Sequence, residues 1–584
     1  MTTSNTSSIV EQLFLGTLEE SSIFPYPDFS TQDREFLGEM LDAIQKFSKG
    51  TISSSHLDET GKMPPEVISG FAEMGLMGLG VPEEFGGLGL SVPLYCRVFE
   101  EIAGIDGAVA TMVGAHQSIG YRALLNEGTP EQKKKWLPDL ASGKKIAAFC
   151  LTEPSSGSDA YSIKTVAKDN GDGTYTISGQ KLWITNGGLA DFYSVFCKTP
   201  VTIDGEVKDK ITCFVVEKSF PGISFGEKEN KMGIRASETR AVFFDQVKVP
   251  KENMLGEFGK GFKIAMKVLN SGRLSLGAGA VGGMKSVFAL ALEHAKTRIQ
   301  FGKPILEFGL IQEKIVKMHS LIYASESAVY LTTGLIAKGM TDYQLESAVC
   351  KVFNSESLWS VVDMSMQIAA GNGYMKEYPY ERIMRDARIN LIFEGTNEIL
   401  RIFLGLSGIQ GPSSNLKQLG KIADIEGALK DPIKSLGIVT TFAKERISKY
   451  MGGKNFLSLH HEELEESAGK FSSALAAFSL EVEDTLLKYG KKILERELIV
   501  QRLSNMVIEL FVMLAVISRT THHLNSGLSS DQKEYLLELS LFTLEESHER
   551  FSTNLKGMKH NRDKRIYSLS KKILEGKYHP FGLS

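Results

Sequence analysis

The chain has 584 residues, of which 42% are hydrophobic and 23% are charged, and its formal net charge at pH 7 is -4. This composition is that of an ordinary soluble globular protein, and the length is too great for one hydrophobic core, so we expect roughly three to five domains of about 150 residues each. The small acidic surplus excludes nucleic acid as the main partner, because binding phosphate needs a basic surplus on at least one face.

The chain begins with residues 1–30, which are predicted to form a loosely held arm whose prolines enforce extended backbone. From residue 31 to 148 the pattern is helical, with apolar residues such as Leu37 and Leu41 at three- and four-residue intervals. From residue 149 to 260 the period changes to two. Short apolar runs separated by turn residues predict a small antiparallel sheet or barrel there.

The pattern is helical again from residue 261 to 406. Residues 407–415, S-G-I-Q-G-P-S-S-N, have the composition of a linker, and residues 416–584 are predicted to form a further helical domain. This order is not the strand–helix alternation of a dinucleotide-binding sheet. Residues 277–282, G-A-G-A-V-G, match G-x-G-x-x-G, but no strand precedes them, so we interpret them as a close helix-packing face.

Cysteine and histidine usage predicts no metal site. The five cysteines are scattered, odd in number and never spaced C-x-x-C, so neither a disulfide framework nor a zinc site is expected, and the compartment is expected to be reducing. His460, His461 and Glu462 are consecutive, and adjacent residues of a helix point in different directions.

The termini and hydropathy bear on location. No apolar run reaches the roughly 18 residues that span a bilayer. The N-terminal residues are acidic and lack both the basic region of a secretory signal and the Arg-rich character of a transit peptide. A cytoplasmic bacterial protein, or an already processed one on the matrix side of mitochondria, fits these features.

One carboxylate, Glu394, follows the apolar run Leu391-Ile392-Phe393 in R-D-A-R-I-N-L-I-F-E-G-T-N-E-I-L-R. Burial disfavours the ionised form, so we expect the pKa of Glu394 to rise toward the range of a general base. Gly395 has no Cβ, which lets a substrate approach closely, and Thr396 can cap a following helix. From these residues alone, an ordinary acidic turn is the alternative.

Two earlier stretches combine strand residues with hydroxyl groups. F-C-L-T-E-P-S-S-G-S-D-A, residues 149–160, enters a loop whose hydroxyls and backbone donors can bind an acceptor-rich group such as a flavin pyrimidine or a pyrophosphate. K-L-W-I-T-N-G-G, residues 181–188, places a tryptophan in a short strand. Without further context, a polar turn and a core strand are the alternatives.

Together, these stretches resemble the signature segments of acyl-CoA dehydrogenases. The resemblance extends without a gap from about residue 30 to 406 and includes R-I-Q-F-G, F-G-L-I-Q-E-K and Q-I-A-A-G-N-G-Y in family order. F-P-Y-P, G-A-H-Q-S-I-G and S-G-R are most similar to the very-long-chain branch. The implied fold is mainly α with a small antiparallel β domain: an N-terminal helical domain, a β-barrel-like middle domain, a four-helix bundle and an extra C-terminal helical domain.

The resemblance implies FAD as the cofactor. Phe149, Trp183 and Thr185 would form a flat, water-poor slot for the flavin ring. The segments around Arg298 and Gln312 would reach the ADP half of the cofactor from a neighbouring subunit, so a homodimer is expected. The implied cofactor-binding residues are Phe149, Leu151, Thr152, Gly157, Ser158, Trp183, Ile184, Thr185, Arg298, Gln300, Phe301, Gln312, Gln367, Gly371, Thr396 and Glu398.

The substrate implied by the resemblance is an acyl-CoA thioester. The residues implied to lie near it are Ser158, Asn270, Arg273, Phe393 and Gly395. The chain departs from the family at a few positions: shorter-chain relatives often have Asp and Thr in place of Asn270 and Gly272, and a Gly-Gly pair is usual where this chain has Ala370-Gly371. The first departure affects thioester recognition, and the second affects only close backbone approach at Ala370.

The reaction implied is α,β-dehydrogenation of a long-chain acyl-CoA to the trans-2-enoyl-CoA in fatty acid β-oxidation. Glu394 would remove the α-proton while the β-hydrogen leaves as hydride to the flavin, and an electron-transfer flavoprotein would take the electrons. The backbone N–H of Glu394 and a flavin ribityl hydroxyl would stabilise charge on the thioester oxygen. The alternatives are an acyl-CoA oxidase that uses oxygen, and a non-enzymatic assembly or scaffold role on the same fold.

Two further predictions concern the acyl chain and a membrane. Gly114, Ala115 and Gly120 could leave room for a long acyl chain at the pocket floor, and close helix packing is the alternative. Residues 430–454 place apolar residues at helical spacing and carry six basic and two acidic residues. They predict an amphipathic helix that makes peripheral contact with an anionic membrane, with a helix packed on its own domain as the alternative.

Overall fold

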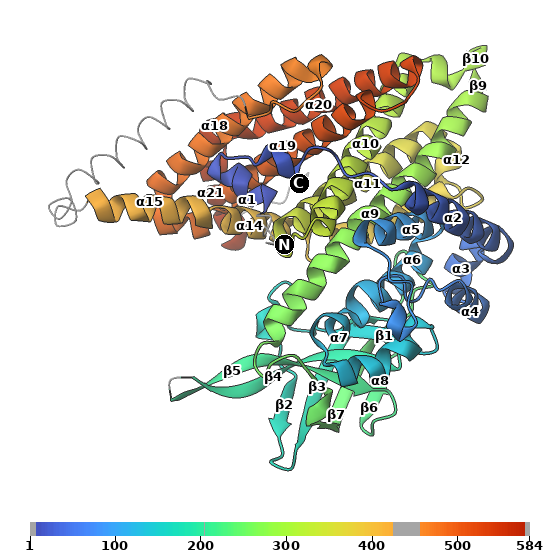
Figure 1. Cartoon of the computed structure of the whole chain (residues 1–584), viewed down its shortest axis with the longest axis vertical. Coiled ribbons are helices and arrows are strands. Elements are labelled where there is room, and N and C mark those ends of the chain that lie inside the picture. The colour runs from blue at the N-terminus through green and yellow to red at the C-terminus, as the bar shows by residue number, and fades with distance from the viewer. Residues whose placement is uncertain (1–7, 204, 424–455, 578–584) are drawn as a thin grey trace. The chain divides into compact units, whose positions relative to one another are not determined.

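The computed structural model describes residues 8–203, 205–423 and 456–577 (Figure 1). They fall into two compact units: the first contains Ser22–Ile399, and the second contains Ile9–Ser21 and Leu400–Ser584. Within the described residues the protein is mainly helical, with one eight-stranded sheet and one two-stranded sheet, so the predicted fold class is confirmed. The predicted amphipathic helix at residues 430–454 lies outside the described residues.

The first unit begins with helices whose ends follow from the sequence. Ser30 accepts a hydrogen bond from the Asp33 N–H at the start of the first of them, and Thr129 accepts one from the Gln132 N–H at the start of the last. The predicted helical pattern is confirmed from residue 31 to Ala141. The helices are α2 (Thr31–Thr51), α3 (Ser54–Thr60), α4 (Pro65–Glu73), α5 (Val92–Ile105), α6 (Gly107–Gly114), the π-helical turn η3 (Ala115–Gly120), α7 (Arg122–Glu127) and α8 (Pro130–Ala141).

The described strands that follow form one sheet, in the order β6-β7-β3-β2-β4-β5-β8, with β1 paired to β4. Neighbouring strands are antiparallel except in the β1–β4 and β2–β4 pairs. The predicted two-residue period is confirmed. The strands are β1 (Ala147–Cys150), β2 (Val166–Asp169), β3 (Thr174–Thr185), β4 (Phe192–Ile203), β5 (Glu206–Glu217), β6 (Ile223–Phe225), β7 (Thr239–Pro250) and β8 (Met254–Leu255).

Long helices complete the first unit. Figure 1 shows α9 leaving the sheet and ending at the small β9–β10 hairpin. Helix α9 packs against α5, α10 and α11. The elements are α9 (Gly261–Thr297), β9 (Ile299–Gln300), β10 (Lys303–Pro304), α10 (Gly309–Ala337), α11 (Gln344–Ala369), α12 (Gly371–Tyr374), α13 (Tyr380–Ala387) and α14 (Asn397–Gly408), in which the unit boundary falls.

The glycines of G-A-G-A-V-G lie in the middle of α9, where neighbouring helices approach closely. A Cβ at Gly277 would lie 3.3 Å from Cys350 of α11, and one at Gly282 would lie 1.9 Å from the Glu100 carbonyl oxygen of α5. Side chains at these positions would separate the helices. The interpretation of this motif as a helix-packing face is therefore confirmed.

The second unit contains the remaining helices of the described residues, and two predictions are wrong there. The predicted loose arm is wrong for α1, because its residues Ile9, Val10, Leu13 and Phe14 are buried, and Phe14 packs edge-on against Phe478. Residues 407–415 are helical rather than a linker. The helices are α1 (Ile9–Leu15), α15 (Gln410–Ala423), α18 (Glu465–Tyr489), α19 (Glu497–Leu524), α20 (Ser530–Lys559) and α21 (Asp563–Leu574).

Short 3-10 turns connect several of these elements. They are η1 (Glu20–Ser22), η2 (Glu83–Phe85), η4 (Ala160–Ser162), η5 (Lys251–Asn253), η6 (Ile305–Glu307), η7 (Arg388–Leu391), η8 (Glu462–Leu464) and η9 (Gly490–Glu495). Two of the described helices, α9 and α19, are long and apolar enough to cross a membrane, but 61% and 83% of their apolar windows are buried in the protein, as core helices are. All five cysteines are buried free thiols.

Candidate active site

A cavity of about 410 Å³ lies inside the first unit. Its wall is formed by α5, α6, η3, α9, α13 and the segment that ends at Glu394, and Thr185 at the end of β3 also reaches it. Most of the lining is apolar or small, including Phe99, Leu276 and Phe393. A largely apolar cavity with a few polar groups is typical of a small-molecule site.

Glu394 lies in a turn of unusual backbone conformation. Its φ is +59°, and Gly395 follows with +93°. The carboxylate oxygen Oε2 is buried and has no hydrogen-bond partner in the described residues. A Cβ at Gly272 would lie 2.7 Å from this oxygen, so the missing side chain of Gly272 makes room for the carboxylate. Thr396 accepts a hydrogen bond from the Ile399 N–H, which confirms its predicted capping role at α14.

Burial raises the pKa of the Glu394 carboxyl to about 7, although Arg273 and Lys351 oppose this rise. The predicted direction of the shift is confirmed. A carboxyl group with such a pKa is ionised in part at neutral pH and still accepts a proton readily, which are the two properties that a general base needs.

One face of α9 extends the cavity away from Glu394. Its lining residues are Gly272, Ser275, Leu276, Gly279, Ala280, Gly283, Ser286 and Leu290. The 18 residues from Gly272 to Leu290 span about 27 Å at about 1.5 Å per helical residue. Because Leu290 is 39% exposed, this face runs from the buried carboxylate to the protein surface.

Only two of the three small residues predicted at the pocket floor line the cavity. Gly114 and Ala115 line the cavity. Gly120 does not, because a Cβ there would lie 2.6 Å from the Ala115 carbonyl oxygen and 2.9 Å from the Ala147 Cβ. The prediction for Gly120 is therefore wrong, and close packing explains this glycine.

The segments implied to hold the flavin ring come together at the ends of β1 and β3. The Leu182 N–H donates to the Thr152 carbonyl oxygen at 2.9 Å. Trp183 lies where the register of β3 against β7 shifts; its φ is +56°, and it is 62% exposed. The Thr185 side chain lines the cavity, and its hydroxyl makes no hydrogen bond to the described residues. The exposed indole of Trp183 and the Thr185 hydroxyl, which has no hydrogen bond to the described residues, fit a flat ligand with polar edges.

A buried ion pair joins the two segments that are implied to hold the flavin ring. The Lys181 ammonium donates to Glu153 Oε1 at 2.8 Å and to the Leu151 carbonyl oxygen at 3.1 Å, and both side chains are buried. Gly157 and Ser158 are exposed in the loop that follows. Phe149 packs on Phe196 with ring centroids 5.0 Å apart. Ile184 is 2% exposed, so only its backbone can meet a ligand.

The residues implied to reach the ADP half do not line this cavity. Arg298, Gln300 and Phe301 lie on the β9–β10 hairpin, and Gln312 lies in the first turn of α10. All are exposed, Phe301 to 94%. The 26 residues of α9 between Gly272 and Arg298 place the hairpin about 39 Å along the helix from Glu394.

The other implied residues differ in their surroundings. Gln367, Gly371 and Glu398 are exposed, and their roles stay predictions. Phe393 lines the cavity, as Glu394 does. Asn270 and Arg273 do not line it; Arg273 donates to the Glu394 carbonyl oxygen and to Asn270 Oδ1, both at 3.2 Å. Arg273 therefore supports the turn that carries Glu394, and its contact with a substrate stays a prediction.

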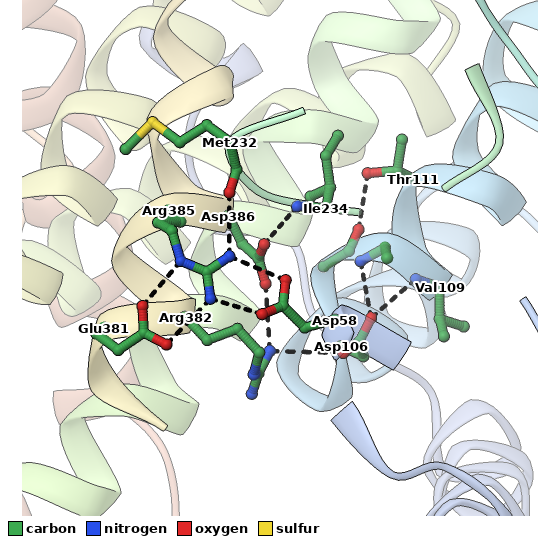
Figure 2. A network of polar contacts seen from close by, with 12 residues as sticks. Asp58, Asp106, Val109, Thr111, Met232, Ile234, Glu381, Arg382, Arg385 and Asp386 are labelled. Carbon is green, nitrogen blue, oxygen red and sulfur yellow. Dashed lines mark hydrogen bonds and ion pairs between the residues drawn. The ribbon is translucent and has the colours of Figure 1, made fainter. Parts of the chain in front are cut away.

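A charged network that local sequence does not reveal lies beside the cavity. Arg385 of α13 donates two hydrogen bonds to Asp58 of α3, at 2.9 and 2.6 Å, and one to the Met232 carbonyl oxygen at 3.0 Å. Figure 2 shows these contacts. Asp386 accepts a hydrogen bond from the Ile234 N–H. The network thus ties α13 to the N-terminal helices and to the loop between β6 and β7.

Part of the same network lines the cavity itself. Arg382 lies 3.2 Å from Asp386 and 3.5 Å from Asp106, which caps α6, and all three residues are in the cavity wall (Figure 2). Burial raises the pKa of the Asp386 carboxyl to about 6. Because α13 leads directly to η7 and Glu394, this anchoring fixes the segment that carries the buried carboxylate.

Comparison with known families matches nearly the whole described chain. Residues 36–144 match the acyl-CoA dehydrogenase N-terminal domain, residues 148–247 the middle domain and residues 259–407 the C-terminal domain of the same family. Residues 462–578 match the ACAD9/ACADV C-terminal domain.

Individual proteins similar to this chain belong to the same family. The very long-chain specific acyl-CoA dehydrogenase of Bos taurus mitochondria is 44% identical, with 90% of this chain and 80% of the relative covered. A probable acyl-CoA dehydrogenase of Bacillus subtilis is 40% identical over 82% of this chain and 79% of its own length. Among solved structures, an acyl-CoA dehydrogenase from Bacillus anthracis complexed with FAD has a TM-score of 0.80 at 32% identity, covering 97% of this chain and 95% of its own.

Proposed function

The chain belongs to the acyl-CoA dehydrogenase family, and from this premise we propose that it oxidises long-chain acyl-CoA thioesters at their α and β carbons with FAD, using Glu394 as the base. The observation that carries the proposal is the buried Glu394 carboxylate, which lies in the wall of an apolar cavity and has a pKa of about 7. Thr185, from the segment implied to bind flavin, lines the same cavity.

The residues of the site fit FAD. Trp183 offers an exposed aromatic face, and the Thr185 hydroxyl is free to bond the edge of a ring that covers it. The Thr152 side chain and the exposed Ser158 lie on the adjoining loop, where hydroxyls suit the polar rim and phosphates of the cofactor. When bound, the flavin accepts the hydride that leaves the β carbon.

The chain itself supplies the proton acceptor and part of the charge stabilisation. Glu394 takes the α-proton, which is too weakly acidic for a free carboxylate unless the thioester oxygen is stabilised. The Glu394 backbone N–H has no hydrogen-bond partner in the described residues, so it is available to donate to that oxygen. Most of the lining is apolar, and a bound acyl chain would displace water from the cavity, which would strengthen both interactions.

The length of the cavity supports a long acyl chain. The α9 face that lines it extends about 27 Å from Gly272 to Leu290. An extended alkyl chain advances about 1.3 Å per carbon, given C–C bonds of about 1.5 Å, so roughly twenty carbons match this distance. Two small residues, Gly114 and Ala115, also line the cavity.

A homodimer is part of the proposal. Trp183 and Thr185 lie on β3 of the sheet, whereas Arg298 and Phe301 lie at the far end of α9, about 39 Å along the helix from Glu394. One cofactor cannot span both groups within a single chain. A second copy that brings its hairpin to this site would complete it, and the exposed Phe301 and Leu310 suit such an interface.

Membership of the family supports an electron-transfer flavoprotein as the acceptor. An oxidase using oxygen remains the second candidate, and oxygen consumption without any added acceptor separates the two. An additional scaffold role is compatible with an intact site. The compartment would be the cytoplasm of a bacterium or the mitochondrial matrix of a eukaryote.

The purified protein is expected to be yellow, to contain about one FAD per chain and to elute as a dimer. It is expected to reduce an artificial electron acceptor when palmitoyl-CoA is added. Absorbance at flavin wavelengths, light scattering and acceptor reduction measure the three properties. A colourless protein that stays colourless after incubation with FAD contradicts the enzymatic function.

We also propose peripheral contact with an anionic membrane, for which α21 gives support besides residues 430–454. Its apolar residues, Ile566, Tyr567, Leu569, Ile573 and Leu574, are all exposed and share one side of the helix. Lys564, Arg565, Lys571 and Lys572 occupy the other side. An exposed apolar face flanked by basic residues suits the lipid interface.

Vesicle binding tests the contribution of α21. The full-length protein is expected to co-sediment with phosphatidylglycerol vesicles at low salt, and the triple variant K571E/K572E/I573D is expected to lose most of this binding. The variant K46E/K49E, which reverses two exposed lysines on α2, is the control and should bind as before. If the triple variant binds unchanged, α21 does not contact the membrane. If it instead loses self-association, a second copy covers this face.

A further inference from the structure

The turn that presents Glu394 is held by two buried cations. Glu394 and Gly395 both have positive φ, a conformation that a glutamate adopts only when surrounding contacts hold it. Arg273 Nε donates to the Glu394 carbonyl oxygen at 3.2 Å, and Lys351 Nζ donates to the Gly395 carbonyl oxygen at 2.8 Å. The two successive carbonyl groups of the turn are therefore both fixed by cationic donors.

Lys351 has an unusual environment for a lysine. It lies on α11 with 0% exposure, and its other polar contact is Asn397 Oδ1 at 2.6 Å. Asn397 is held in turn, since its Nδ2 donates to Ser355 Oγ at 3.0 Å and to Glu356 Oε1 at 3.1 Å. The Lys351 ammonium thus joins α11 to both sides of the turn, at Gly395 and at the first residue of α14.

Lys181 is the other buried lysine of the described residues, and it is paired with a carboxylate, as burial of a charge normally requires. The Lys181 ammonium lies 2.8 Å from Glu153, and even Lys285, whose side chain is 39% exposed, pairs with Glu100 at 2.7 Å. Lys351 forms no ion pair with the described residues, and both of its partners are neutral oxygens. No carboxylate in contact with the ammonium therefore neutralises its charge.

We propose that Lys351 is a positioning residue for the catalytic base: its ammonium fixes the Gly395 carbonyl and thereby the conformation in which the Glu394 carboxylate faces the cavity. Its charge also favours the ionised form of Glu394. This inference rests on the proposed function, because it takes Glu394 as the base. It adds a residue 43 positions away that touches neither substrate nor cofactor.

The charged groups around Lys351 and Glu394 determine in which direction the loss of Lys351 shifts the pH dependence of activity. The charged groups that act on Lys351 are Glu394, Arg273, Glu356 and Glu398, and those that act on Glu394 are Arg273 and Lys351. Burial lowers the pKa of the Lys351 ammonium to about 7, and Glu394 opposes this shift. Removing the ammonium takes away a charge that lowers the pKa of Glu394, so the base would be ionised only at higher pH.

The test compares K351M and K351R with the wild-type holoenzyme over pH 5.5–9. A nearby opposite charge shifts a carboxyl pKa by roughly one to three units. In K351M we expect the acidic limb of the kcat/KM profile to move to higher pH by about one pH unit. At pH values below this limb, kcat/KM should be about tenfold lower than in wild type. We expect it to stay or to move down in K351R, because a guanidinium remains charged throughout this range.

Two measurements separate this effect from misfolding and from failure of the proposed function. The variant K285M removes another lysine of the same unit and should lower thermal stability without moving the acidic limb. If K351M does not fold, K351R still decides, since an upward shift of its limb contradicts the proposal. If the acidic limb of kcat/KM is unchanged in both K351M and K351R while E394Q is inactive, Lys351 has no positioning role. If E394Q is active, Glu394 is not the base, and the proposed function itself fails.

Discussion

The substitution E394Q is expected to abolish nearly all dehydrogenation while FAD and acyl-CoA still bind. The amide keeps the shape of the side chain but cannot accept the α-proton, and removal of a general base typically lowers the rate by roughly 10²-fold to 10⁴-fold. Steady-state kinetics with palmitoyl-CoA and an artificial acceptor measure the loss. Flavin absorbance and its change on adding acyl-CoA show that the site remains formed.

The wild-type pH profile and a second variant sharpen this test. Because the pKa of Glu394 is raised to about 7, the wild-type kcat/KM should increase as the pH rises through 7, where the carboxyl becomes ionised. E394D keeps a carboxylate with a side chain one methylene shorter, so its activity should lie between those of wild type and E394Q. If E394Q retains more than roughly a tenth of the activity, another residue is the base.

The substitution G279L is expected to convert the protein to a preference for short acyl chains. Gly279 lies seven residues from Gly272 on the lining face of α9, which is about 10 Å or roughly eight carbons from the base. A leucine there would block the cavity beyond that point. Each methylene left outside loses about 0.8 kcal/mol of burial, so excluding only four lowers kcat/KM for palmitoyl-CoA by roughly 200-fold.

A matched substitution further along the same face provides the control. Ser286 lies about 21 Å from Gly272, so S286L should spare chains of up to roughly sixteen carbons and affect only longer ones. Hexanoyl-CoA should remain a substrate of both variants. If G279L lowers the rates with hexanoyl-CoA and palmitoyl-CoA equally, the acyl chain does not follow α9.

Local sequence was sufficient for features that depend on neighbouring residues. The apolar run before Glu394 correctly predicted a carboxyl with a raised pKa, and Thr396 correctly predicted the start of α14. The changes of period located the helices and the sheet. The same reasoning would have found α1, because Ile9, Val10, Leu13 and Phe14 recur at helical spacing and are all buried.

Composition misled the prediction for residues 407–415. The Gly, Pro and Ser residues suggested a linker, but Pro412 is the third residue of α15, in the first turn, where no backbone N–H is needed. Helix continuation there depends on position within the helix and not on composition.

Features that depend on distant contacts could not be predicted. Lys351 precedes Glu394 by 43 residues and gives no local sign that it reaches Gly395. The bond between Arg385 and Asp58 joins residues 327 positions apart. The sequence also could not distinguish the roles of the two glycines of G-A-H-Q-S-I-G. Only the packing shows that Gly114 lines the cavity and that Gly120 lies close to Ala147.

The buried cysteines make the protein well suited to site-specific labelling. Burial raises the pKa of the Cys150, Cys197 and Cys350 thiols to about 12, and all five cysteines of the chain are shielded from solvent. Since the thiolate is the nucleophile, these groups should react slowly with maleimides at neutral pH. A single cysteine introduced at Ser568, on the basic side of α21, would then carry a fluorescent dye without prior removal of the native thiols, and its emission would report on the surroundings of that helix.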